Sequence, residues 1–195
     1  MENSQFVILL LVLSAIGAYF FFKGKKKSFN TPLEDLKVGT KLSIKKFGDR
    51  KEEFTLEVKS KNRHEAEDGD LFWYEYNCIS DRGEEFWLQI ESIDPYEING
   101  GNRTLNINEL GVAVDDLLKI KEGELAFHYL GQAYYMDSGG SARCYINEGE
   151  QSYLYAFIEF YDSTDTKYIS VEVVEGENPK VYLSFEIETN QINLL

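Results

Sequence analysis

Hydrophobic and polar residues alternate along most of the chain beyond residue 32, as in β-strands that bury one face. The runs "TKLSI", "EFTLEV", "EFWLQIES", "YLYAFIEFY", "KYISVEVVEG" and "KVYLSFEIE" follow this period. Turn residues, such as those at positions 80–83, separate the runs. Residues 107–123 instead have a helical pattern, with Asn108 as the expected N-cap and Gly123 as the expected stop. The sequence therefore predicts a mainly β protein.

Parts of this strand pattern occur twice. The segment "WLQIE" at residues 87–91 matches "YISVE" at residues 168–172 in the order of aromatic, aliphatic and acidic positions. An acid followed by an aromatic residue stands in the preceding strand in both cases, at residues 75–76 and 159–160. Chance similarity between strand-rich segments is the alternative explanation. We favour an internal duplication.

The duplication predicts two similar antiparallel β meanders, residues 33–99 and 114–195, joined by a connection over residues 100–113. One meander alone cannot bury its apolar face. We therefore expect the two β-rich repeats to pack into a single barrel-like or sandwich-like unit.

The N-terminal residues follow a different pattern. Residues 6–22, "FVILLLVLSAIGAYFFF", carry no charge and nearly span a bilayer core at about 1.5 Å per residue. Lysines follow directly, and positive flanks stay in the cytoplasm. We predict a single-pass transmembrane anchor with its lysine flank in residues 1–27, a tether in residues 28–32, and a C-terminal domain on the cytoplasmic face of the inner membrane. A cleaved signal peptide is disfavoured because the acidic Glu2 precedes the apolar run.

Charge limits the partners of the protein. The 195 residues carry a net charge of −14, and most acidic residues lie beyond the N-terminal lysines. Nucleic acid is excluded as a partner, because binding to phosphates needs clusters of Lys and Arg. Membrane lipid is expected to contact residues 6–22. Cys78 and Cys144 are predicted to be buried free thiols, with a disulfide between them as the alternative.

No residue pattern points to a known reaction. The glycine-rich segments lack the strand–loop–helix context of a phosphate loop. His64 lies in a charged segment and is predicted to be solvated, while His128 is predicted to occupy a surface or sheet position. The acidic segments 65–70 and 162–165 are predicted to be solvated loops and not cation sites. We predict no cofactor and no metal site, and an enzyme is not favoured.

The aromatic hairpin, residues 72–91, carries the candidate binding residues. Trp73 and Trp87 fall on the more polar faces of their strands, where we expect a cross-strand pair. An exposed pair would form a recognition patch. A structural pair, or packing inside a closed barrel, is the alternative. The candidate binding residues are Trp73, Glu75, Asp81, Arg82 and Trp87.

The runs "FWYEYNCISDRGEEFWLQIE", "LEDLKVGTKLSI", "FHYLGQAYYM" and "YLYAFIEFYD" resemble bacterial proteins of the family known as domain of unknown function 4178. The resemblance covers most of residues 33–195. It implies a bacterial protein with a β-rich domain, encoded near membrane-stress and polyamine-synthesis genes. It implies no catalytic residues.

Two functions compete at this point. The first is a membrane-anchored interaction module that binds a protein partner and is linked to envelope stress. The second is a small-molecule-binding β barrel, or an enzyme that uses buried carboxylates. The candidate carboxylates are Glu75, Glu91, Glu159 and Glu172. A cavity lined by these glutamates would favour the second function, and a filled core with the glutamates outside would favour the first.

Overall fold

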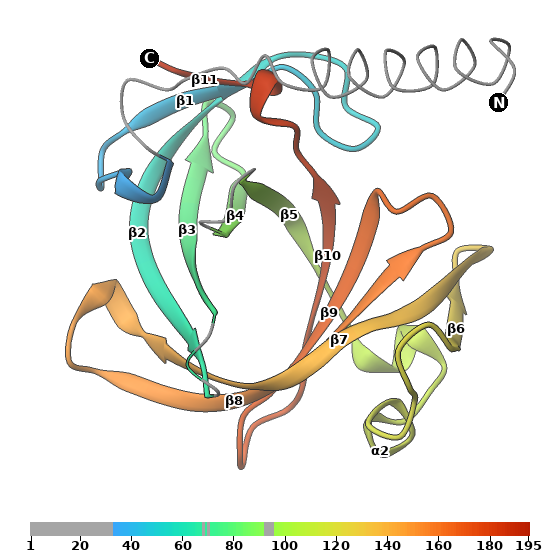
Figure 1. The fold of residues 1–195 in the computed structure, drawn as a ribbon. Coiled ribbons are helices and arrows are strands. Elements are labelled where there is room, and N and C mark those ends of the chain that lie inside the picture. The colour runs from blue at the N-terminus through green and yellow to red at the C-terminus, as the bar shows by residue number, and fades with distance from the viewer. Residues whose placement is uncertain (1–32, 68, 70, 92–95) are drawn as a thin grey trace, which may run out of the picture.

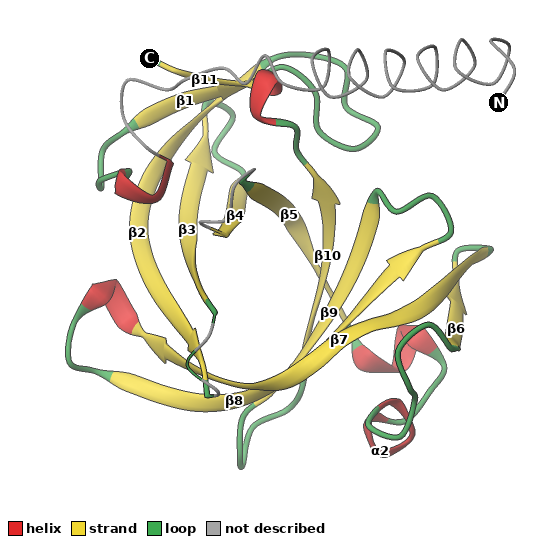
Figure 2. Ribbon diagram, viewed as in Figure 1, coloured by secondary structure: helices red, strands yellow, loops and turns green. Residues whose placement is uncertain are grey.

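The computed structural model describes residues 33–67, 69, 71–91 and 96–195. Within these residues, antiparallel strands form one continuous sheet (Figure 1), and Figure 2 shows that helical turns are few and short. The strands are β1 (Lys41–Ile44), β2 (Phe54–Ala66), β3 (Phe72–Ser80), β4 (Glu85–Glu91), β5 (Glu97–Leu105), β6 (Leu125–Tyr129), β7 (Gln132–Tyr145), β8 (Ser152–Asp162), β9 (Lys167–Val173), β10 (Lys180–Glu186) and β11 (Ile192–Leu194). The helical turns are η1 (Leu33–Asp35), η2 (Ile107–Leu110), α2 (Val114–Leu117), η3 (Ile146–Glu148) and η4 (Thr189–Gln191).

The sheet closes because β2 and β7 pair with each other. Its order is β11-β1-β2-β3-β4-β5-β10-β9-β8-β7-β6. Residues 63–66 of β2 pair with residues 142–145 of β7, which closes β2–β5 and β7–β10 into an 8-strand antiparallel barrel. β1 and β11 extend the sheet beside β2, and β6 extends it beside β7. The prediction of a mainly β, barrel-like protein is confirmed.

Each half of the barrel is a meander with its own apolar core. β1 to β5 are neighbours in chain order, as are β6 to β10, and the halves meet at the β2–β7 and β5–β10 pairs. The first core holds side chains of β1–β5 and of the C-terminal segment, such as Leu88 and Ile192. The second core holds side chains of the other half, such as Phe160 and Val181. Because each core covers one face of its meander, the opposite face is left to meet the other half.

The predicted strands are present, but β2 and β5 extend beyond what the sequence pattern predicted. The predicted hairpin is present as β3 and β4, and Gly83 in its turn has a φ of +79°. Strand β5 spans Glu97–Leu105 and so crosses the predicted boundary at residue 99. Its sequence, "EINGGNRTL", contains two glycines and several polar residues, which are depleted in strands. The strand forms because β4 and β10 pair with it on both sides.

The prediction of one helix over residues 107–123 is wrong. Two short turns, η2 and α2, take its place, because Gly111 adopts the left-handed conformation (φ 68°) and ends η2. The cap is Asn106 and not Asn108. The Asn106 side chain accepts a hydrogen bond from the Asn108 backbone N–H, and Glu109 completes a capping box.

No helix in the described part of the chain is long and apolar enough to cross a bilayer. The predicted anchor, residues 6–22, lies outside the described residues, as do its lysine flank and the tether. The anchor therefore stays a prediction.

Candidate functional site

A small cavity lies where the two halves face each other, and we call it the central chamber. Its walls come from β3 and β4 of the first half and from β8, β9 and β10 of the second. The lining residues are Trp73, Glu75, Trp87, Gln89, Tyr155, Phe157, Glu159, Ser170, Glu172 and Tyr182. The chamber has a volume of about 30 Å³, which is room for about one or two water molecules.

Strand alternation brings these side chains together. On β3, Trp73 and Glu75 lie on the face opposite to Tyr76, which is buried in the first core. On β4, Gln89 pairs in register with Glu75, and Trp87 lies on the same face. Three of the predicted binding residues, Trp73, Glu75 and Trp87, therefore line one cavity.

The two tryptophans do not form the expected cross-strand pair. The β3–β4 register places each of them opposite another residue. Trp73, which is 6% exposed, meets Phe157 edge-on with ring centroids 5.8 Å apart. Trp87 meets Tyr182 edge-on at 5.7 Å. Both rings contact the second half of the barrel, so they form walls of the chamber and no exposed patch.

A glycine fixes the position of Trp87. A Cβ atom on Gly101 would lie 2.6 Å from Cζ2 of Trp87 and 2.6 Å from the carbonyl oxygen of Leu183, so only glycine fits there. The indole Nε1 of Trp87 is buried and has no hydrogen-bond partner among the described residues. An unsatisfied buried donor of this kind costs about 1–3 kcal/mol.

Four glutamates lie in the chamber or directly beside it, at positions 75, 91, 159 and 172. In the described part of the chain each of them accepts hydrogen bonds from neutral side chains and forms no ion pair. The donors are Asn62 (3.0 Å) and Asn77 (3.3 Å) for Glu75, Ser138 (3.1 Å) and Ser170 (3.2 Å) for Glu159, Gln89 (3.3 Å) for Glu91, and Tyr182 for Glu172.

This environment disfavours the ionised carboxylates. Burial, followed by repulsion from Glu159, raises the pKa of Glu91 to about 7. Burial, followed by repulsion from Glu75, raises the pKa of Glu172 to about 7. Burial also raises the pKa of Glu75 and of Glu159, although their amide and hydroxyl donors act in the opposite direction. Near neutral pH the cluster therefore still holds protons.

A wider cavity of about 430 Å³, which we call the outer pocket, adjoins the chamber. The two share four wall residues, which are Trp73, Gln89, Phe157 and Glu159. The acidic residues that line the outer pocket are Glu67, Glu91, Glu97, Asp137 and Glu159. None of its described lining residues is Lys or Arg. The outer pocket and the chamber thus form one acidic space that opens at the surface.

A bulge in β7 supplies the part of the outer pocket that the sequence analysis missed. The β7–β8 register shifts between Met136 and Gly139, and the bulged residues Asp137 and Ser138 line the pocket. Burial raises the pKa of Asp137. The segment "DSGGS" interrupts the strand pattern between "AYYM" and "ARCYI", and this interruption was the available signal.

His64 is buried, so the prediction of a solvated loop residue is wrong. It is 2% exposed, stacks on Trp73 at 5.3 Å, and places Nδ1 2.7 Å from the Tyr155 hydroxyl. The charged segment around it belongs to β2, which continues to Ala66 and pairs with β7 there. Burial lowers the pKa of His64 to about 4, so the ring is neutral near pH 7 and supports the chamber wall. His128 on β6 is exposed, in agreement with the prediction of a surface position.

Asp162 is also buried, at 2% exposed, where a solvated loop was predicted. Its carboxylate accepts hydrogen bonds from the Thr164 hydroxyl (2.8 Å) and from the backbone N–H groups of Thr166 (3.2 Å) and Lys167 (3.3 Å). These bonds organise the turn between β8 and β9. Asp162 therefore has a structural role in that turn.

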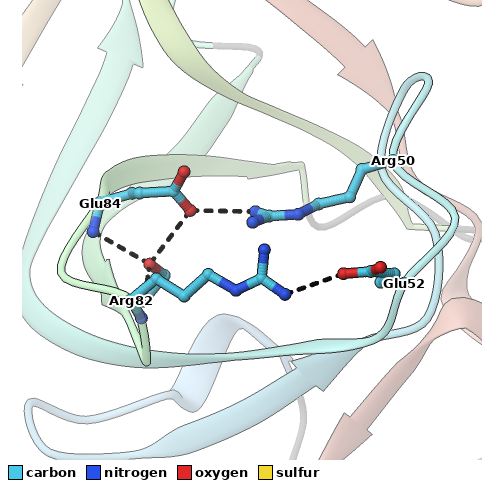
Figure 3. A network of polar contacts seen from close by, with 5 residues as sticks. Arg50, Glu52, Arg82 and Glu84 are labelled. Atoms are coloured by element: carbon cyan, nitrogen blue, oxygen red, sulfur yellow. Dashed lines mark hydrogen bonds and ion pairs between the residues drawn. The ribbon is translucent and has the colours of Figure 1, made fainter.

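Asp81 and Arg82 lie away from the chamber. They occupy the exposed turn between β3 and β4. Arg82 pairs with Glu52 at 2.8 Å, and Arg50 pairs with Glu84 at 3.1 Å, so the turn is tied to the segment that precedes β2 (Figure 3). Exposed ion pairs contribute about 0–1 kcal/mol. The predicted binding set therefore divides into three chamber residues and two residues of a surface turn.

The two cysteines are buried and free, as predicted, and the alternative of a disulfide is wrong. Burial raises the pKa of Cys78 to about 12, so its thiol is not reactive. Within the residues that the structure describes, no group of three or more His, Cys, Asp and Glu side chains is arranged to hold a metal ion.

No curated protein and no solved structure matches this chain. Residues 38–189 match the family described as "Domain of unknown function (DUF4178)". The match begins before β1 and ends after β10, so it covers the barrel, the chamber and the outer pocket. The chain belongs to the DUF4178 family.

Proposed function

We propose that the barrel binds a small organic cation, which enters through the outer pocket. One observation carries this proposal: an acidic pocket without Lys or Arg among its described lining residues continues into a chamber with further buried glutamates. A volume of about 430 Å³ suits a small molecule. A glutamate-lined cavity was the feature expected of a small-molecule barrel.

The physical case for a cation rests on charge and on aromatic rings. Buried carboxylates without counter-charges are costly to ionise, and a cationic guest would offset that cost. Trp73 and Phe157, at the boundary of pocket and chamber, offer ring faces and edges close to Glu159. A cation over such a ring gains about 0.5–2 kcal/mol. An anionic guest would meet repulsion from the same walls.

The similar pKa shifts of the four glutamates favour a binding role over a catalytic one. General acid–base catalysis by two carboxyl groups usually needs environments that push their pKa values apart. Here burial raises the pKa of both Glu91 and Glu172 to about 7, and that of Glu75 and Glu159 in the same direction. A uniform shift is expected of a site that exchanges protons for a cation.

Calorimetric titration of the full chain, purified in a non-ionic detergent, tests this function. Pentylamine, pentanol and pentanoate share a chain and differ in charge. We expect saturable binding of pentylamine only. Glu159→Gln should weaken it roughly tenfold, about 1.4 kcal/mol, while the exposed control Glu52→Gln leaves it unchanged. Pentanoate or pentanol binding as tightly as pentylamine, or no saturable binding of the amine, would refute the proposal.

We also propose a location for this barrel: the cytoplasmic face of a bacterial inner membrane, held there by residues 1–27, with residues 6–22 in contact with lipid. The uncharged run and the lysines behind it support this placement. Deletion of residues 1–27 should move the protein from the membrane fraction to the soluble fraction. A reporter fused to the C-terminus should be active in the cytoplasm, and periplasmic activity would contradict the orientation. We also propose a protein partner and a link to envelope stress. A pull-down from the host would identify such a partner.

We infer in addition that the two meanders arose by duplication. Their strand orders agree, and two glutamates hold matching places: Glu75 pairs with Gln89 in the β3–β4 hairpin, and Glu159 pairs with Ser170 in the β8–β9 hairpin. Glu91 and Glu172 each follow these hairpin partners by two residues. Sequence profiles of the two halves, each built from many family members, should align with each other significantly. Failure to do so would favour chance similarity.

A further inference from the structure

The central chamber has space for a group of a particular size. Trp73 and Phe157 line both cavities and so lie at the boundary between the chamber and the outer pocket. The outer pocket, at about 430 Å³, accepts a bulky head group, whereas the chamber, at about 30 Å³, does not. About one water-sized group fits there. A primary ammonium has that size, and a trimethylammonium is several times larger.

The chamber also has the charge that such a group needs. Glu75 and Glu172 line it from opposite halves and repel each other in their ionised forms. Their hydrogen-bond partners, which include Asn62 and Tyr182, are neutral. Lys180 interacts with both carboxyl groups from a distance, but it is not a lining residue and its ammonium pairs with Glu177 at 3.4 Å.

One polar atom of a wall residue also lacks a hydrogen-bond partner in the described part of the chain. The buried Nε1–H of Trp87 has no partner among the described residues, although Trp87 lines the cavity beside Tyr182. An ammonium group has no acceptor, so this N–H would need a carboxylate oxygen as its partner.

We propose that the ligand is an unbranched primary amine whose ammonium group passes Trp73 and Phe157 and lies between Glu75 and Glu172. The alkyl chain then runs back past the two rings into the outer pocket. Methylated ammonium groups are excluded from the chamber by their size. This inference rests on the proposed function and assigns the ligand class and the residues that select it.

The first test compares head groups on the unmodified full chain in a non-ionic detergent. Pentylamine and trimethylpentylammonium carry the same charge and the same chain. We expect calorimetry to show pentylamine binding at least about tenfold more tightly, which is about 1.4 kcal/mol. Equal affinities would overturn the inference and leave the proposed function intact, because the head group would then stay in the outer pocket. No saturable binding of either cation would refute both.

The second test distinguishes binding of the ammonium group in the chamber from binding in the outer pocket. Glu172→Gln should weaken pentylamine binding roughly tenfold and leave trimethylpentylammonium unchanged, because only the smaller head reaches the chamber. The matched variant Glu91→Gln, in the outer pocket, should weaken both. Thermal unfolding would verify that each variant is folded. A folded Glu172→Gln protein with unchanged pentylamine affinity would place the ammonium elsewhere; if this variant does not fold, the head-group comparison still decides the inference.

Discussion

The first apolar core and the central chamber lie on opposite faces of the same strands, and they bury opposite kinds of side chain. On β4, Leu88 and Ile90 are almost fully buried in the core, while Gln89 and Glu91 point to the chamber and the outer pocket. The core contributes free energy through apolar burial. The chamber instead hides carboxyl groups, which costs free energy unless they are protonated or paired. Side chains that lower stability in this way are expected where a protein binds or reacts.

The largest expected effect on stability comes from truncating a side chain of the first apolar core. Phe86 is 3% exposed and meets the rings of Phe47 at 5.3 Å and Phe54 at 5.1 Å. We expect Phe86→Ala to lower the free energy of unfolding by about 3–5 kcal/mol. Urea denaturation of the full chain, followed by circular dichroism, measures the change.

The matched change on the chamber side is Glu75→Gln, also on the first half of the barrel. It keeps the shape of the side chain and removes a charge that is already disfavoured there. We expect a stability within about 1 kcal/mol of the unmodified protein, or slightly higher. If Glu75→Gln destabilised the protein as much as Phe86→Ala, the chamber would be part of the structural core, and the distinction between the two regions would fail.

The sequence predicted those features that depend on neighbouring residues. The period of two on β3 and β4 placed Trp73 and Glu75 on one face and Tyr76 on the other, and the structure agrees. The same local pattern predicted the hairpin turn at Gly83. We predicted a binding role for Trp73 and Glu75 because they lie on the polar face of the strand. The sequence alone did not show that this face packs against the second half of the barrel.

Features that depend on distant pairing could not be predicted. His64 is buried because β2 runs on to pair with β7, and the partner residue, Cys144, lies far along the chain. Asp137 reaches the outer pocket through a bulge that only the β7–β8 register defines. The predicted boundary at residue 99 failed for a similar reason. β5 crosses it because pairing with β4 and β10 makes this segment a strand, although its composition does not favour one. Closure of the barrel therefore determines which residues lie together at the candidate site.

A further effect should appear in the pH dependence of stability, and it distinguishes the chamber from the core because the core has no comparable groups. Glu91 and Glu172 have a folded-state pKa of about 7, above the ordinary value of 4.5, and burial is the main cause. Between these values the folded state binds more protons than the unfolded state, so stability falls as pH rises. The loss should be complete above pH 7, and each unit by which a folded-state pKa is raised contributes about 1.4 kcal/mol to it.

Urea denaturation at a series of pH values between the two pKa values checks this slope. The titratable neighbours that face these groups are Glu75, Glu97, Asp137, Glu159 and Lys180. A protein with both Glu91→Gln and Glu172→Gln should lose part of the slope, because Glu75, Glu159 and Asp137 also have raised pKa values, and it should be more stable than the parent above pH 7. Glu52→Gln, on the exposed turn, should keep the slope. The carboxylates with lowered pKa, such as Asp162, act in the opposite direction but at lower pH, below the window. A stability that rose with pH across this window would show that the chamber glutamates are already paired with positive charge, and the cation proposed as their partner would have no reason to bind.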